Sequence, residues 1–256
     1  MLEGLYAGSI ADAERRKQSV TAAQLEVEIS SIPHALNVLE HFAKRDTVHV
    51  LAEVKRASPS RGDLAAIADP AELAKTYANN GATGISVLTE ERKFKGSLDD
   101  LRAVRAAVTV PVLRKEFIAN EYQLLEARAA GADMALLIVA GLTKSELRRL
   151  KEFTESLGMT AFIETHDREE VEIALELDAK FVGVNARNLS TFKTDRNLFG
   201  SLVELFPSNV IKVAESAVRN AEDVRHYREH GADVVLVGEA LVTSDAAATL
   251  RTFLSV

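Results

Sequence analysis

Eight short apolar runs, rich in β-branched residues, recur along the chain and alternate with amphipathic stretches. We expect strands at residues 49–56, 84–90, 110–118, 134–140, 160–166, 181–187, 210–216 and 233–239. Between them, residues 120–131, 143–158 and 168–177 have the periodicity of amphipathic helices. Strands that alternate with helices are typical of a parallel sheet, and eight βα units of this length are what a (β/α)8 barrel requires.

An internal repeat favours the same architecture. NNGATGISV, AAGADMALLI and EHGADVVLV each end a helical stretch with Gly-Ala and enter a strand, and LELDAKFVGV is a weaker copy without the glycine. Gly81, Gly131 and Gly231 are expected to close helices in a left-handed conformation, and their spacing fits a unit of two βα modules. A doubly wound open sheet is the alternative, but it usually has fewer strands and often a G-x-G-x-x-G turn, which is absent.

These patterns predict an α/β protein, with residues 1–256 forming a single (β/α)8 TIM-barrel domain. Residues 1–48 precede the first expected strand and contain helical patterns, ADAERRKQ at 11–18 and SSIPHALNVLEHFAK at 30–44. We therefore expect an extra N-terminal helical segment that covers one end of the barrel.

Composition excludes several classes of function. The net charge of −7, without a basic patch, argues against a nucleic-acid partner. The chain has no cysteine, which excludes disulfides, thiolate catalysis and cysteine-based metal sites. The N-terminus lacks the pattern of a signal peptide, and the longest apolar run, 134–142, is far short of the ~20 residues of a membrane span. We expect a cytoplasmic protein without membrane contact, either a monomer or a weak homo-oligomer.

Polar residues occur late in five of the apolar strands. Glu53 and Lys55 are two residues apart, so both should face the barrel interior. Active sites of such barrels lie at the C-terminal ends of the strands, where these side chains would converge: Glu53, Lys55, Lys115, Glu164, Asn185, Arg187, Glu215 and Ser216. Any one of them alone is more typical of a structural ion pair. Together, two lysines and three acids predict acid–base catalysis.

A phosphate site is expected beside this cluster, because the loops after strands seven and eight of such barrels often bind phosphate through backbone N–H groups. The candidates are Ser216, Ala217, Gly238 and Glu239, with Ser58 and Arg56 from the first loop. Gly238 could instead be a packing glycine. Phe94 and Phe117 fit either an aromatic pocket or the core. His166 follows Glu164 by two residues, but no third ligand is evident, so we expect no metal.

Seven motifs, in order along the chain, resemble those of the indole-3-glycerol-phosphate synthase family of the tryptophan pathway, in its monofunctional form. They are AEVKRASPSRG, GSLDDL, PVLRKEFI, EARAAGADMALLIVA, GVNARNLSTF, AESAV and ADVVLVGEAL. The resemblance implies that a phosphorylated small molecule, 1-(2-carboxyphenylamino)-1-deoxyribulose 5-phosphate, closes its ring with loss of CO₂ and water and without a cofactor. The product would be indole-3-glycerol phosphate.

The resemblance also implies roles for the candidate residues. Lys115 would be the general acid and Glu164 the general base. Lys55 would hold the substrate carboxylate and is a candidate proton donor in dehydration, with Glu53 positioning it. The remaining implied substrate contacts are Asn185, Glu215 and a bracing Arg187, then Ser58, Ser216, Ala217, Gly238 and Glu239 at the phosphate, and Phe94, Phe117, Leu136 and Leu189 around the anthranilate ring.

Two positions depart from the family pattern. Glu116 stands where the family usually has Asp, and Ala217 stands where it usually has Gly. The longer Glu116 side chain is expected to displace whatever that carboxylate orients, and the Cβ of Ala217 lies where backbone normally approaches phosphate. Two other functions stay open at this point: a Schiff-base aldolase using Lys115 or Lys55, and a non-catalytic sugar-phosphate binder.

Overall fold

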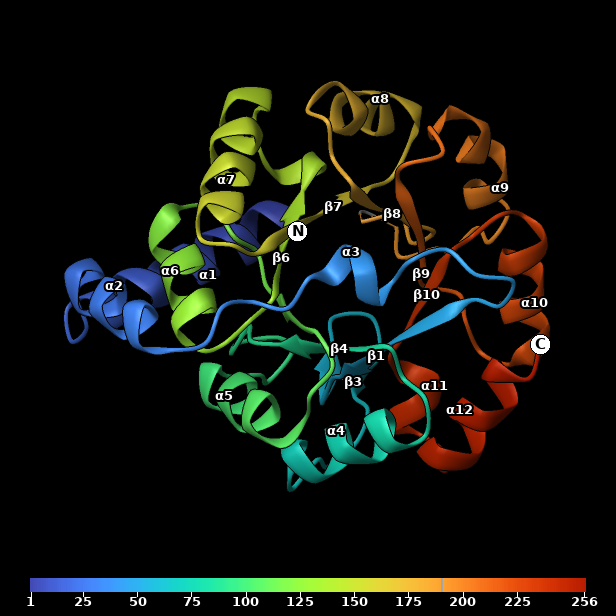
Figure 1. The fold of residues 1–256 in the computed structure, drawn as a ribbon, viewed down its shortest axis with the longest axis horizontal. Helices are drawn as coiled ribbons and strands as arrows, with labels where there is room; N and C mark the ends of the chain where they lie inside the picture. The colour runs from blue at the N-terminus through green and yellow to red at the C-terminus, as the bar shows by residue number, and fades with distance from the viewer. Residues whose placement is uncertain (190) are drawn as a thin grey trace.

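The computed structural model describes residues 1–189 and 191–256, and eight parallel strands close into a barrel (Figure 1). The barrel strands are β1 His49–Val54, β4 Gly84–Leu88, β5 Val112–Lys115, β6 Met134–Ile138, β7 Thr160–Thr165, β8 Phe181–Asn185, β9 Ile211–Glu215 and β10 Val234–Val237. Their order is β1-β10-β9-β8-β7-β6-β5-β4, and β1 pairs with β4 to close the ring. The predicted (β/α)8 barrel is confirmed, and each strand ends before its expected last residue.

Helices surround the barrel, as Figure 1 shows. They are α1 Leu2–Lys17, α2 Ala22–Ser31, α3 Val38–His41, α4 Pro70–Asn79, α5 Leu98–Ala107, α6 Glu121–Ala129, α7 Lys144–Ser156, α8 Arg168–Glu176, α9 Leu198–Leu202, α10 Ala221–Glu229, α11 Glu239–Val242 and α12 Ala246–Leu254. Two 3-10 turns, η1 Val139–Gly141 and η2 Val203–Leu205, and a small antiparallel pair, β2 Ala57–Ser58 with β3 Gly62–Asp63, complete the fold. Most longer helices begin at a Ser, Thr, Asp or Asn whose side chain accepts a backbone N–H of the first turn.

The glycine repeat has the conformation that we expected. Gly81, Gly131 and Gly231 have φ values of +97°, +86° and +85°, which a Cβ would strain. In the weaker copy, Asp178 takes the same place at φ +56°, since Asp tolerates the left-handed region better than most residues do. Each helix therefore stops sharply, and the chain turns directly into the next strand.

Side chains alternate along each strand between two parts of the core. Leu51 and Glu53 of β1 point into the barrel, whereas Val50, Ala52 and Val54 pack against the surrounding helices. Large apolar side chains fill the barrel interior on the N-terminal side of Glu53. Among them are Phe162 of β7 and Phe181 of β8, whose rings pack edge to face with centroids 5.1 Å apart. Polar side chains therefore occupy the last inward positions, at the C-terminal end of the barrel.

The N-terminal segment reaches both ends of the barrel, whereas we expected it at one. Phe42, directly after α3, packs edge to face against Phe181 at the first residue of β8, which closes the N-terminal end. At the other end, Met1 and Leu5 line a cavity among the C-terminal ends of the strands. The helical pattern expected over residues 30–44 is interrupted: α2 ends at Ser31 and helix resumes only at Val38–His41, and Pro33 between them lacks the N–H that a continuous helix needs.

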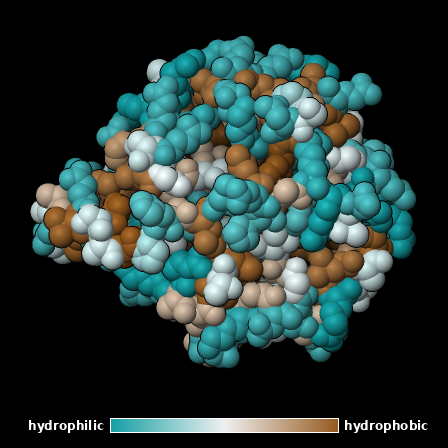
Figure 2. All heavy atoms as spheres, in the orientation of Figure 1, coloured by the Kyte–Doolittle hydropathy of each residue, from teal (hydrophilic) through white to brown (hydrophobic). Residues whose placement is uncertain are grey.

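The face of the molecule seen in Figure 2 is mostly polar. In the space-filling view, hydrophilic side chains cover much of the visible face, with hydrophobic ones between them, and the projecting α2 carries both kinds (Figure 2). Within the described residues, no helix is both long and apolar enough to cross a membrane.

Asp133 generates a prediction for stability. Its buried carboxylate accepts the N–H groups of Leu36 and Val112, both at 2.8 Å, and pairs with Arg105 at 2.6 Å. Asp133→Ala leaves these donors without their partner, so we expect the free energy of unfolding to fall by about 2 kcal/mol or more in urea titrations. Glu172→Ala, which removes only an exposed pair with Arg168, should change it by less than about 0.5 kcal/mol. Equal effects of the two changes would contradict the stabilising role assigned to the Asp133 carboxylate.

Candidate active site

A cavity of about 500 Å³ opens among the C-terminal ends of the barrel strands. Its lining includes every candidate residue except Arg56, namely Glu53, Lys55, Ser58, Phe94, Lys115, Phe117, Leu136, Glu164, Asn185, Arg187, Leu189, Glu215, Ser216, Ala217, Gly238 and Glu239. The barrel therefore brings together, in one hollow, residues that are up to 186 positions apart in the chain (Glu53 to Glu239).

Lys115 lies at the centre of the charged cluster. Its Nζ is 2.5 Å from Oε2 of Glu215 on β9 and 3.3 Å from Oε2 of Glu164 on β7, and it sits 6.0 Å from the centroid of the Phe162 ring. Both carboxylates are nearly inaccessible to solvent. The last inward positions of three strands thus form one ammonium–dicarboxylate cluster, in which the pairs are strongly coupled because little water screens them.

The charges within the cluster shift the pKa values of Glu164 and Glu215 in opposite directions. Burial raises the pKa of Glu164, but Lys115, His166 and Asn185 outweigh it and hold that pKa well below the ordinary value. Burial and the charge of Glu164 raise the pKa of Glu215 to about 8, against the opposing effect of Lys115. Burial opposes the charge of Lys115, yet Glu215, Glu164 and Glu53 raise its pKa above the ordinary value. Near neutral pH, Lys115 is a cation and Glu164 an anion, and Glu215 can hold a proton.

A second ion pair lies beside the cluster. Nζ of Lys55 is 2.6 Å from Oε1 of Glu53, and the hydroxyl of Ser86 donates to Oε2 of Glu53 at 3.5 Å. Gly238 is the inward residue after β10, where a Cβ would collide with the Glu53 carboxylate and come within 3.0 Å of Nζ of Lys55. Gly238 therefore has a packing role at this pair, and because it also lines the cavity, its part in phosphate binding stays a prediction.

Gly183 has a similar effect at the central cluster, and we did not predict it. A Cβ at this position of β8 would collide with Oε1 of Glu215 and come within 2.6 Å of the Phe162 ring. The signal was present in the sequence, since a glycine inside an apolar strand often marks a close approach.

Asn185 connects the cluster to the next loop. Its Nδ2 donates to Oε1 of Glu164 at 3.0 Å, and its Oδ1 accepts from the backbone N–H of Arg187 at 3.0 Å and from Oγ of Ser216 at 2.8 Å. These three contacts fix the amide orientation, because the donor and acceptor ends of the amide meet complementary groups.

The loop after β9 has an unusual backbone. Ser216 and Ala217 both have positive φ values, +68° and +56°, and the Tyr227 hydroxyl donates to the Ser216 carbonyl at 3.2 Å. Each such non-glycine residue costs about 1–3 kcal/mol, and such strain is common at functional sites. Ala217 therefore occupies a position where glycine would relax the chain. Glu239, also in this part of the cavity, pairs with Arg61 at 2.7 Å.

Arg56 does not reach the cavity. It follows the inward Lys55, so its side chain leaves on the opposite side. There its guanidinium pairs with Asp100 and donates to the carbonyl of Ile67 at 3.2 Å. The expectation of an anion contact from Arg56 is not supported by this geometry; Arg61, which we did not predict, lines the cavity instead.

The other end of the cavity is apolar. Phe94 and Phe117 have ring centroids 6.0 Å apart, and Tyr6 of α1 meets Phe117 edge to face at 5.8 Å. Met1 and Leu5 add to this wall. The contribution of α1 was not predicted, because no sequence pattern shows which part of the barrel an added helix contacts.

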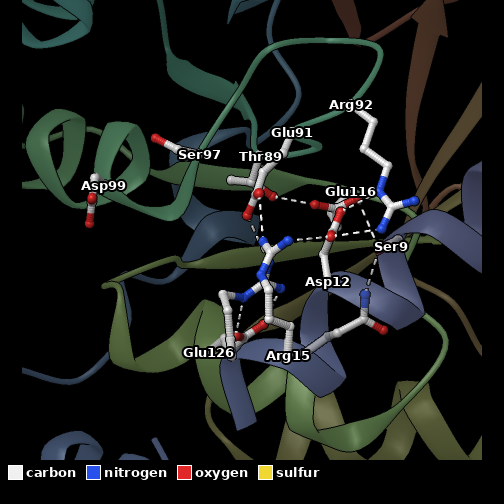
Figure 3. A network of polar contacts seen from close by, with 12 residues as sticks. Ser9, Asp12, Arg15, Thr89, Glu91, Arg92, Ser97, Asp99, Glu116 and Glu126 are labelled. Atoms are coloured by element: carbon white, nitrogen blue, oxygen red, sulfur yellow. Dashed lines mark hydrogen bonds and ion pairs between the residues drawn. The ribbon is translucent and has the colours of Figure 1, made fainter. Parts of the chain in front are cut away.

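Glu116, the first departure from the family pattern, is buried and fully engaged (Figure 3). Its carboxylate accepts from Oγ of Ser9 on α1 at 3.1 Å, from Oγ1 of Thr89 at 2.8 Å and from the backbone N–H of Phe117 at 2.9 Å. In the same view, Asp12 of α1 pairs with Arg92 at 2.8 Å. The longer side chain thus holds α1 against the strand end that carries Lys115.

Comparison with known sequences gives a family. A family model described as indole-3-glycerol phosphate synthase matches residues 2–253. The chain is 58% identical over 253 residues to a protein named indole-3-glycerol phosphate synthase from Leifsonia xyli subsp. xyli, covering 99% of this chain and 97% of the relative. It is 53% identical over 244 residues to a protein of the same name from Mycolicibacterium gilvum, covering 95% and 89%.

Comparison with solved structures shows the fold alone. A thiamine phosphate pyrophosphorylase from Pyrococcus furiosus is similar with a TM-score of 0.61 and 14% identity, over 81% of this chain and 94% of that one. An N-acetylmannosamine-6-phosphate 2-epimerase from Clostridium perfringens is similar with a TM-score of 0.63 and 14% identity, over 86% and 98%.

The backbone at Ala217 generates the prediction for this site. Ala217→Gly removes the penalty of a Cβ at φ +56°, but it also gives the unfolded chain more freedom, at a cost of about 0.5–1 kcal/mol. We expect the first effect to be equal or larger, so that the melting temperature stays or rises and the Kd for inorganic phosphate stays or falls. Calorimetric titration of both forms checks this. A Kd weakened by more than about tenfold would show that the Ala217 side chain is a fitted part of the site.

Proposed function

The chain belongs to the indole-3-glycerol phosphate synthase family, and from the geometry of its cavity we propose how its residues carry out the reaction of that family. The protein is a carbon–carbon lyase of tryptophan biosynthesis. It closes the ring of 1-(2-carboxyphenylamino)-1-deoxyribulose 5-phosphate, with loss of CO₂ and water, to give indole-3-glycerol phosphate. A cytoplasmic location is part of the proposal, which the biosynthetic role of the family supports.

The cavity has one polar and one apolar end, which suits a substrate with a phosphate at one end and an aryl ring at the other. Backbone around Ser216, Ala217 and Gly238, with the Ser58 hydroxyl, would bind the phosphate. The ring would lie against Phe94 and Phe117, with Leu136 and Leu189 beside it. Holding both ends brings the reacting carbons of one flexible molecule together, and such positioning can supply several kcal/mol of the barrier.

The position of Lys115 between two buried carboxylates is the observation that carries the assignment of the general acid. As the aryl carbon attacks the ribulose carbonyl, electrons move onto the carbonyl oxygen. The Lys115 ammonium donates a proton there, and the oxygen becomes a hydroxyl group. Loss of CO₂ from the same aryl carbon restores the aromatic ring. Lys115 remains protonated in the free enzyme because Glu215 and Glu164 stabilise its charge.

The dehydration step needs a base and an acid. Glu164, held ionised by its surroundings, takes the proton that is lost as the indole double bond forms. Lys55, paired with Glu53, donates a proton to the hydroxyl group that leaves as water, and it also faces the substrate carboxylate before CO₂ is lost. Asn185 keeps Glu164 in place, and Arg187 braces the loop beyond it.

A Schiff-base mechanism fits this geometry poorly. The nucleophile of an aldolase is a neutral amine, which requires a lysine whose pKa is lowered. Lys115 instead contacts two carboxyl groups that raise its pKa. The charged ammonium is suited to donate a proton and is unsuited to attack a carbonyl.

Lys115→Met tests the assignment of the acid. The thioether keeps much of the stem volume but carries no proton, so we expect kcat to fall by roughly 10²- to 10⁴-fold while KM changes little. Turnover is followed by the fluorescence of the indole product after the substrate is added. Lys144→Met, which removes an exposed pair with Glu176, is the matched control and should keep the wild-type rate. A loss of less than about tenfold in Lys115→Met would exclude Lys115 as the acid.

A further inference from the structure

His166 is a half-buried charge next to the catalytic cluster that the mechanism above does not use. It follows β7 directly and lies two residues beyond Glu164. Its Nδ1 is 3.0 Å from Oε2 of Glu170, and its Nε2 is 3.3 Å from Oε1 of Glu164. The Nε2 atom is buried and has no hydrogen-bond partner in the part of the chain that the structure describes, so its contact with Glu164 is an ion pair rather than a hydrogen bond.

The start of α8 fixes the orientation of this imidazole. Asp167 caps the helix by accepting the N–H of Glu170 at 2.9 Å. The Glu170 side chain turns back and accepts the backbone N–H of His166 at 2.7 Å with the same oxygen that faces Nδ1. With Nδ1 held in this way, the geometry of the ring directs Nε2 toward Glu164.

Both ring nitrogens face carboxylate oxygens, and this determines the protonation state. A neutral imidazole carries one N–H and one lone pair, so one carboxylate would face a lone pair. Only the imidazolium presents a proton to each. Burial lowers the pKa of His166, but Glu164 and Glu170 outweigh it and raise that pKa to about 10. The other charged groups near the His166–Glu164 contact are Glu170 of α8, Lys115 of β5 and Glu215 of β9. The charge of Glu164 also raises the pKa of the buried Tyr6 hydroxyl of α1.

We propose that His166 is a positioning residue whose imidazolium keeps Glu164 the ionised member of the Glu164–Glu215 pair. The two carboxyl groups share Lys115, but only Glu164 also contacts His166 and Asn185. Without that cation, the proton shared within the cluster would be divided more evenly between the two acids. The inference rests on the proposed role of Glu164 as the base, because an ionised Glu164 is what that role requires.

Two variants separate charge from hydrogen bonding. His166→Gln places an amide N–H near the Nε2 position, and His166→Asn places one near the Nδ1 position, but neither carries charge. Removing the cation raises the pKa of Glu164, so more of it is protonated and inactive at low pH. In a plot of kcat/KM against pH, we expect the decline on the acid side (the acid limb) to occur about one pH unit or more higher in both variants than in the wild type. His226→Gln on α10 is the control and should leave the profile unchanged.

A nitrogen NMR titration tests the charge without activity. The chain has six histidines. We expect one imidazole to keep both nitrogens protonated beyond about pH 9, far above the ordinary histidine pKa, and its signal to vanish in His166→Gln and His166→Asn. The absence of any imidazole that keeps both nitrogens protonated above about pH 8 would overturn the proposal.

The base itself is tested by a separate variant. If Glu164→Gln retains kcat within about threefold of the wild type, Glu164 is not the base, and the proposed mechanism falls together with the role of His166. If Glu164→Gln is inactive but both His166 variants keep the wild-type acid limb, only the inference on His166 is wrong. An inactive Glu164→Gln together with shifted limbs in both His166 variants supports it.

Discussion

The pairing of the half-buried Lys115 ammonium with the buried Glu164 and Glu215 is the interaction on which the site depends. Taking three such ionisable groups out of water is unfavourable unless each finds a partner. The partners come from the last inward positions of β5, β7 and β9, with Asn185 of β8 completing the set. Small residues on the same layer, Gly183 and Gly238, leave room for the carboxylates. The same layer of side chains therefore fills the end of the barrel and supplies the catalytic groups.

The surroundings make two chemically identical carboxyl groups different. Among the described residues, Glu164 makes polar contacts with a lysine, an amide and an imidazole, whereas Glu215 makes a side-chain polar contact with the lysine alone. One site can therefore hold an ionised base and a protonatable acid near neutral pH, because small differences in neighbouring charge are large where water is excluded. The helix start at α8 contributes to this, since it orients the Glu170 side chain that holds His166.

Much of this arrangement could be predicted from the sequence. Period-two alternation placed Glu53 and Lys55 inside the barrel, and the Gly-Ala repeat located the helix ends. Side-chain contacts across the barrel could not be predicted, because a strand pattern gives direction but not distance. For that reason the contact between Glu215 and Lys115 was not predicted, Arg56 was expected at an anion, and His166 was considered only as a metal ligand. The contact of α1 with the cavity depends on Glu116 reaching Ser9, a tertiary match that neither segment shows alone.

The division of charge between the two carboxyl groups is the central claim, and infrared spectroscopy of the free enzyme tests it most directly. Because the pKa of Glu215 is raised to about 8, a protonated-carboxyl stretching band should be present at neutral pH and should disappear as the pH rises through that value. The band should be absent from Glu215→Gln. A wild-type spectrum without a carboxyl group that titrates above about pH 6, well beyond the ordinary range of glutamate, would contradict the account.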